Sequence, residues 1–68
     1  MSPLQAYVMR VIRIGGGTVS IVDGAPRIGW SRTSFTARTV RALAKAGHLA
    51  RTADAGEVYR VAEHKEEP

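Results

Sequence analysis

The sequence predicts an α+β domain with two amphipathic helices, short strands between them and a C-terminal β-hairpin. Apolar residues recur at helical spacing over residues 3–14 and again over 37–46. Alternating β-branched residues, separated by Asp-Gly and other glycine-containing turns, favour a short strand or hairpin over 18–31 and a hairpin over 49–61. A chain of 68 residues is long enough for one domain, which we expect over residues 1–62.

The first helix is predicted by a capping signal followed by an apolar stripe. Ser2 is a favourable N-cap, and Pro3 suits the first turn of a helix. Three glycines at 15–17 end the helix, because glycine loses much backbone entropy there and accepts the positive φ of a C-cap. The stripe expected to face the core contains Leu4, Tyr7, Val8, Val11, Ile12 and Ile14, and leaves Gln5, Met9, Arg10 and Arg13 outside it.

A β-hairpin is predicted after this helix. The alternating residues 18–22 read as a strand, and the Asp-Gly pair at 23–24 is a strong signal for a two-residue turn. Residues 27–31 alternate again, which places Ile28 and Trp30 together on one face. A short helix over the same stretch is the alternative, which its glycines and proline disfavour.

The second helix, 37–46, is specified at both ends and is cationic along one face. Thr36 is a good N-cap, Gly47 supplies a left-handed stop, and Phe35 before the cap can pack on Val40 as a hydrophobic staple. Val40, Leu43 and Ala44 form the packing face, and Arg38, Arg41 and Lys45 form the opposite face. No carboxylate lies on this helix to offset the repulsion between its cations, so we expect a group outside the helix to do so.

The C-terminal hairpin is predicted from two short segments around a polar turn. Leu49, Tyr59 and Val61 are expected to face the core. Residues 63–68 contain no apolar anchor and are predicted to form an acidic, flexible tail.

The charge balance points to a polyanionic partner. The chain carries a formal net charge of +4, and residues 1–62 carry nine basic and three acidic side chains. Such a balance favours nucleic acid or an anionic surface. The chain has no cysteine, no apolar run long enough to span a bilayer and no signal-peptide pattern, so we expect a cytoplasmic protein without a membrane partner.

Residues 36–49, which close with Ala-Gly-His-Leu, and residues 51–61 resemble the recognition helix and wing of the winged helix-turn-helix superfamily. The chain looks like the small stand-alone modules of phages and mobile elements. The resemblance implies that the second helix enters the major groove and that the wing touches the adjacent backbone or minor groove. The helix that normally precedes the recognition helix is replaced here by a strand or loop over 23–30.

The expected function is therefore that of a DNA-binding protein, either a transcriptional regulator or an accessory factor. Arginine pairs bidentately with guanine, so Arg38 and Arg41 are the candidates for base edges and Lys45 for phosphate. Thr33, Ser34 and Thr36 lie where phosphate is favoured, although capping and turn chemistry is the stronger interpretation of their hydroxyls. The predicted nucleic-acid-binding residues are Arg27, Arg32, Thr36, Arg38, Arg41, Lys45, Arg51 and Arg60. Arg60 has an alternative role as an ion-pair partner of Glu57 or Asp54.

Two alternatives remain open. The first is a protein-interaction module, such as a phage-type inhibitor or adaptor, that binds an acidic protein surface through the same basic face or through the edge at Trp30. The second concerns Trp30 and Phe35, which would suit a stacking platform for single-stranded nucleic acid, although core packing is the stronger interpretation for all four aromatic residues. A monomer with about four or five phosphate contacts would bind weakly, so a homodimer or a partner is expected for tight binding.

Catalytic and metal chemistry find little support in the sequence. His48 and His64 are isolated from any carboxylate or serine in a recognisable pattern, and no cysteine accompanies them. The glycines at 15–17 follow a helix and precede a strand, which is the reverse of the order around a phosphate-binding loop. We expect neither enzyme activity nor a cofactor.

Overall fold

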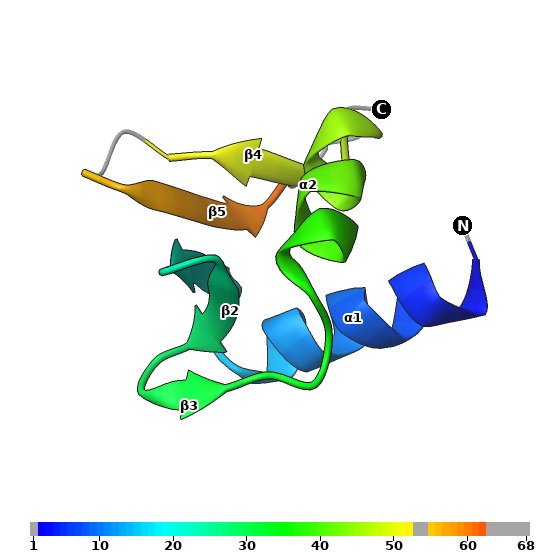
Figure 1. Ribbon diagram of the computed structural model, residues 1–68. Helices are drawn as coiled ribbons and strands as arrows, with labels where there is room; N and C mark the ends of the chain where they lie inside the picture. The colour runs from blue at the N-terminus through cyan, green and yellow to red at the C-terminus, as the bar shows by residue number, and fades with distance from the viewer. Residues whose placement is uncertain (1, 53–54, 63–68) are drawn as a thin grey trace.

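The computed structural model describes residues 2–52 and 55–62, and this part of the chain contains two helices and five strands (Figure 1). The elements are α1 (Pro3–Ile14), β1 (Thr18–Val22), β2 (Ala25–Ile28), β3 (Ser31–Arg32), α2 (Ala37–Lys45), β4 (Leu49–Arg51) and β5 (Glu57–Val61). The strands form one antiparallel sheet in the order β3-β2-β1-β5-β4. The predicted tail, 63–68, lies outside the described residues.

The single core lies between the helices and one face of the sheet. Its buried residues come from both helices, from three strands and from the segment before α2: Val8, Met9, Ile12, Val19, Phe35, Val40, Leu43, Leu49 and Tyr59. Because both helices contribute to one cluster, they cover the same face of the sheet, and no helix of the described residues lies on the other face.

Helix α1 begins as predicted but is rotated relative to the expected stripe. The Ser2 side chain accepts from the Gln5 N–H at 3.1 Å, and the Gln5 side chain accepts from the Ser2 N–H at 3.2 Å, which completes a capping box. The helix ends at the glycines, where Gly16 and Gly17 have positive φ.

The expected core stripe of α1 is wrong in four positions. Met9 is buried, whereas Leu4, Tyr7 and Ile14 are exposed by 55%, 51% and 77%. A small sheet covers only a narrow arc of the helix, and that arc is centred on Val8 and Ile12. The flexible methionine side chain fills its edge.

The first hairpin forms at the predicted turn, and the chain then turns a second time. Asp23 and Gly24 have φ of 52° and 79°, as a type I′ turn requires. Strand β2 ends at Ile28, and Gly29 with φ of 64° leads into β3, so residues 27–31 do not form one strand. Trp30 lies in this turn and is 95% exposed, so its predicted place in the core beside Ile28 is wrong. The short-helix alternative is also excluded.

Strand β5 occupies an inner position and joins the two hairpins. It pairs with β1, where Val19 faces Tyr59, and with β4, where Leu49 faces Val61. Leu49 and Tyr59 are buried and Val61 is half-buried against the core, which confirms the three residues predicted to face inward.

Helix α2 has the predicted caps. Thr36 accepts from the Thr39 N–H at 3.4 Å, and Gly47 has φ of 93° after the helix ends at Lys45, one residue earlier than expected. Val40 and Leu43 are fully buried, and Ala44 packs against the core. The packing face and the cationic face of this helix are therefore those that the sequence predicts.

Candidate nucleic-acid interface

The cationic face of α2 is exposed, but one of its three cations is already bound. Arg38, Arg41 and Lys45 are all exposed. Arg41 donates from Nε to Oε2 of Glu57 at 2.7 Å and from Nη2 to Oε1 at 2.8 Å, so its bidentate edge is occupied by a carboxylate of β5. Arg38 and Lys45 form no ion pair or side-chain hydrogen bond within residues 2–52 and 55–62.

Glu57 is the centre of a four-residue cluster that ties the β4–β5 hairpin to α2. The Tyr59 hydroxyl donates to Oε2 of Glu57 at 2.7 Å. Arg51 lies opposite Tyr59 in the sheet, with its guanidinium carbon 5.8 Å from the centroid of the tyrosine ring, and it donates to the Gly56 carbonyl at 3.0 Å. Arg41 and Arg51 therefore both hold the hairpin in place.

The cluster fixes the charge of Glu57. Hydrogen bonds from Arg41 and then from Tyr59 lower the pKa of Glu57 to about 2. The same bonds raise the pKa of Arg41 and the pKa of Tyr59. In both residues the hydrogen bond to Glu57 is the largest cause. Glu57 is thus ionised at neutral pH and supplies the carboxylate that α2 lacks. The alternative pairing of Glu57 with Arg60 is not formed, and Asp54 lies outside the described residues.

Three other arginines predicted to bind nucleic acid lie on the face of the sheet that points away from the core. Arg27 and Arg32 are directly paired across β2 and β3, and Arg60 is paired with Thr18 across β5 and β1. Side chains alternate along a strand, so these arginines point away from the face that carries Val19 and Tyr59. The predicted residues therefore form two separate groups, one on α2 and the β4–β5 hairpin and one on the uncovered face of the sheet.

The hydroxyl groups before α2 serve local structure, in line with the stronger interpretation of the sequence. Thr36 caps the helix. The Thr33 hydroxyl lies within hydrogen-bond distance of two carbonyl oxygens that can accept its proton, that of Phe35 at 3.2 Å and that of Pro26 at 3.3 Å. Ser34 is exposed.

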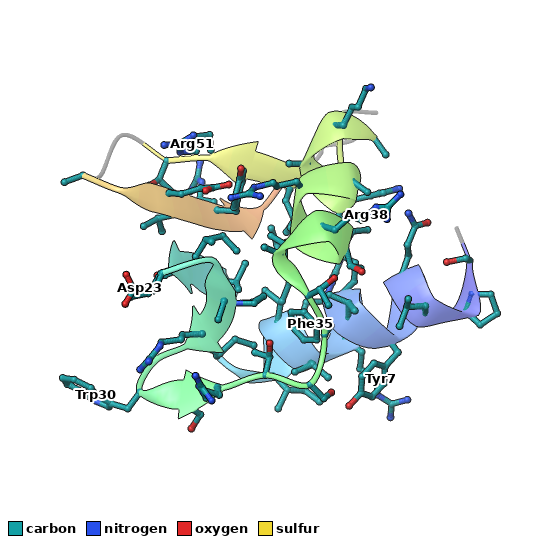
Figure 2. The ribbon with its side chains drawn as sticks, viewed as in Figure 1. Tyr7, Asp23, Trp30, Phe35, Arg38 and Arg51 are labelled. Carbon is teal, nitrogen blue, oxygen red and sulfur yellow. The ribbon has the colours of Figure 1, made fainter. Side chains whose placement is uncertain are left out.

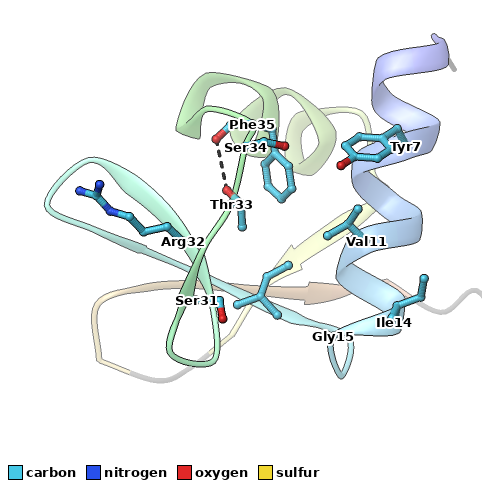
Figure 3. Close-up of a pocket in the computed structure, with 10 residues that line it drawn as sticks. Tyr7, Val11, Ile14, Gly15, Ser31, Arg32, Thr33, Ser34 and Phe35 are labelled. Carbon is cyan, nitrogen blue, oxygen red and sulfur yellow. Dashed lines mark hydrogen bonds between the residues drawn. The ribbon is translucent and has the colours of Figure 1, made fainter.

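A shallow pocket lies between α1 and the segment that leads from β3 to α2 (Figure 3). Its volume is about 590 Å³, and its apolar walls are Tyr7, Val11, Ile14, Ile28 and Phe35. The sequence did not predict this pocket, because Tyr7 and Ile14 were placed in the core. Its other lining residues are Gly15, Ser31, Arg32, Thr33 and Ser34. No carboxylate or histidine lines it, so it brings together no acid–base pair.

Comparison with known proteins finds no matching family model, no similar curated protein and no similar solved structure.

The described residues are strongly cationic and contain no group suited to hold a metal ion. Nine of them are Arg or Lys and two, Asp23 and Glu57, are acidic. No cluster of three His, Asp or Glu side chains occurs within them. Neither helix of this part of the chain has the length and apolar character needed to cross a bilayer.

Proposed function

We propose that this chain is a small DNA-binding protein, a transcriptional regulator or accessory factor, that presents α2 to duplex DNA. The observation that carries the proposal is the exposed face of α2. There, Arg38 and Lys45 have no partner within the described residues, and Glu57, the carboxylate of that part of the chain that contacts α2, is bound to Arg41. Cations held on a helix without internal partners are available to phosphates and base edges.

The order of the elements supports a winged-helix interpretation. Helix α2 is followed by the β4–β5 hairpin, whose second strand pairs with β1 after α1. In the superfamily that the sequence resembles, the corresponding helix enters the major groove and the hairpin is the wing. Strands β2 and β3 stand where that superfamily has a further helix, so backbone contacts in this region would come from a hairpin.

The side chains divide into different roles under this proposal. Arg38, in the first turn of α2, is the candidate for a base edge, and Lys45, in the last turn, is the candidate for a phosphate. Arg41 acts as a positioning residue, because its bond to Glu57 fixes the angle between the helix and the wing. Arg51 steadies the wing from the other strand.

Fluorescence anisotropy with a labelled random duplex tests the proposal. We expect binding at about 50 mM salt that weakens steeply as salt rises. The double variant Arg38→Ala, Lys45→Ala should weaken binding and reduce the log–log salt slope by about 0.9, which corresponds to the phosphate contact assigned to Lys45. The matched control is Arg10→Ala, Arg13→Ala, which removes two exposed charges from α1 and should leave the slope nearly unchanged. Absence of binding at low salt, or equal losses in the two variants, would overturn the proposal.

A second candidate function is the binding of an acidic protein surface by the same face. The Arg41–Glu57 pair favours it, because this face already holds a carboxylate in bidentate geometry. A glutamate-rich peptide in the same titration separates the two functions. Binding of the peptide, together with no binding of duplex at about 50 mM salt, would select this alternative.

A further inference from the structure

The most exposed large apolar side chain within the described residues is Trp30, at 95% exposure. It is the only tryptophan of the chain, and it projects from the turn between β2 and β3, away from the body of the protein (Figure 2). Gly29, with φ of 64°, occupies the first turn position and places Trp30 at the tip of the hairpin. A large aromatic ring held out on a tight turn contributes nothing to the core, so its surface is available to a ligand.

Two arginines occupy the second pair of strand positions from this turn, next to the pair Ile28 and Ser31. Arg27 and Arg32 are opposite each other across β2 and β3, an arrangement of like charges that is unfavourable in a sheet. Neither forms an ion pair within residues 2–52 and 55–62. The Nε of Arg27 is buried and has no hydrogen-bond partner there, which is rare for a buried donor. Arg27 and the exposed Arg32 thus place two positive charges side by side, with no carboxylate of the described residues paired to either of them.

From these observations we infer that the β2–β3 hairpin binds single-stranded nucleic acid. A phosphate of the strand lies between Arg27 and Arg32, and the neighbouring base stacks on the indole of Trp30. Arg60, on the same uncovered face of the sheet, offers a further cation to the strand. An unpaired strand fits better than a duplex, because the face of a base is accessible to an aromatic ring only when the base is not stacked between its neighbours.

This site is separate from the proposed duplex-binding face. Arg27, Arg32 and Arg60 lie on the sheet face opposite the core, whereas the cations of α2 are carried by a helix on the core side. The inference therefore does not rest on duplex binding, and each site can be removed without removing the other.

The single tryptophan makes the test direct. In a titration with the twelve-nucleotide oligonucleotide dT12 at about 50 mM salt, we expect quenching of Trp30 fluorescence. By anisotropy with labelled dT12, Trp30→Ala should weaken binding about 5- to 150-fold, and Trp30→Phe should restore part of the loss. Arg27→Ala, Arg32→Ala should reduce the salt slope by about 1.4, as expected for two contacts to a single strand. Circular dichroism of each variant verifies the fold.

The matched control is Arg38→Ala, Lys45→Ala, which should weaken duplex binding and leave dT12 binding within about twofold of the original. If the control variant weakened dT12 binding as much as Arg27→Ala, Arg32→Ala does, the binding would reflect general charge attraction. That result would overturn the inference. Trp30 fluorescence that is unchanged by dT12 would also overturn it. A blue shift with phosphatidylserine vesicles but no response to dT12 would assign the hairpin to a lipid surface instead.

Discussion

Replacement of Glu57 by Gln should strengthen duplex binding, even though Glu57 contacts no DNA in the proposed complex. Glu57 is an anion on the wing. Glu57 occupies the bidentate edge of Arg41, so its neutralisation releases one cation on the exposed face of α2. Gln retains an oxygen that can accept from the Tyr59 hydroxyl and from one N–H of Arg41, and the pairing of β5 with β1 and β4 keeps the hairpin in the sheet. One additional phosphate contact steepens the log–log salt slope by about 0.9. The loss of affinity between 50 and 200 mM salt then grows by about 3.5-fold.

The assay is fluorescence anisotropy with a labelled duplex at four salt concentrations, applied to three variants. Glu57→Gln should steepen the slope. Arg41→Ala should leave it close to that of the unchanged protein, because Arg41 is already neutralised by Glu57. The double variant should match Arg41→Ala. A slope that flattens by about 0.9 in Arg41→Ala alone would refute the reasoning, since it would mean that phosphate displaces Glu57 from Arg41.

Three further outcomes follow from the packing and the ionisation of the same domain. The pKa of Glu57 is lowered from 4.5 to about 2, so the stability that its bonds provide is complete above about pH 4.5 and is lost as the pH falls toward 2. Urea unfolding at pH 5 and pH 2.5 should show a smaller difference in Glu57→Gln than in the unchanged protein. Leu43→Ala removes a fully buried side chain and should lower the free energy of unfolding by about 2–5 kcal/mol in urea titrations, whereas a loss below about 1 kcal/mol would mean that the core is loosely packed. Gly15→Ala places a methyl group against Cγ2 of Ile28 and should cost about 1–3 kcal/mol in the same titrations, with a smaller cost when Ile28→Ala is already present.

The parts of the fold that sequence predicts well are those specified by neighbouring residues. Thr36 and Gly47 set the ends of α2, and the Asp-Gly pair sets the first hairpin turn, because capping and positive φ depend on local chemistry. The prediction that Trp30 lies in the core is wrong because residues 27–31 do not form one continuous strand. Alternation continues through Gly29, and only the positive φ of that glycine reveals a second turn.

The parts that sequence missed depend on contacts between distant residues. Which arc of α1 is buried depends on how much of the helix the sheet covers, so Tyr7 and Met9 exchanged their expected places. The Arg41–Glu57 pair joins residues 16 positions apart. The sequence did indicate that a group outside α2 offsets its charge, but the register of β5 decides which carboxylate reaches it.

The inner position of β5 makes the whole sheet depend on a segment near the end of the described chain. Among the described strands, residues 57–61 alone join β4 to the rest of the sheet, and they are the last element of the described chain to be synthesised. Without this segment, β4 has no strand of the described chain to pair with, so the two halves of the sheet cannot join. The surface built from α2 and its neighbouring hairpin is therefore complete only once residues 57–61 have paired with both β1 and β4.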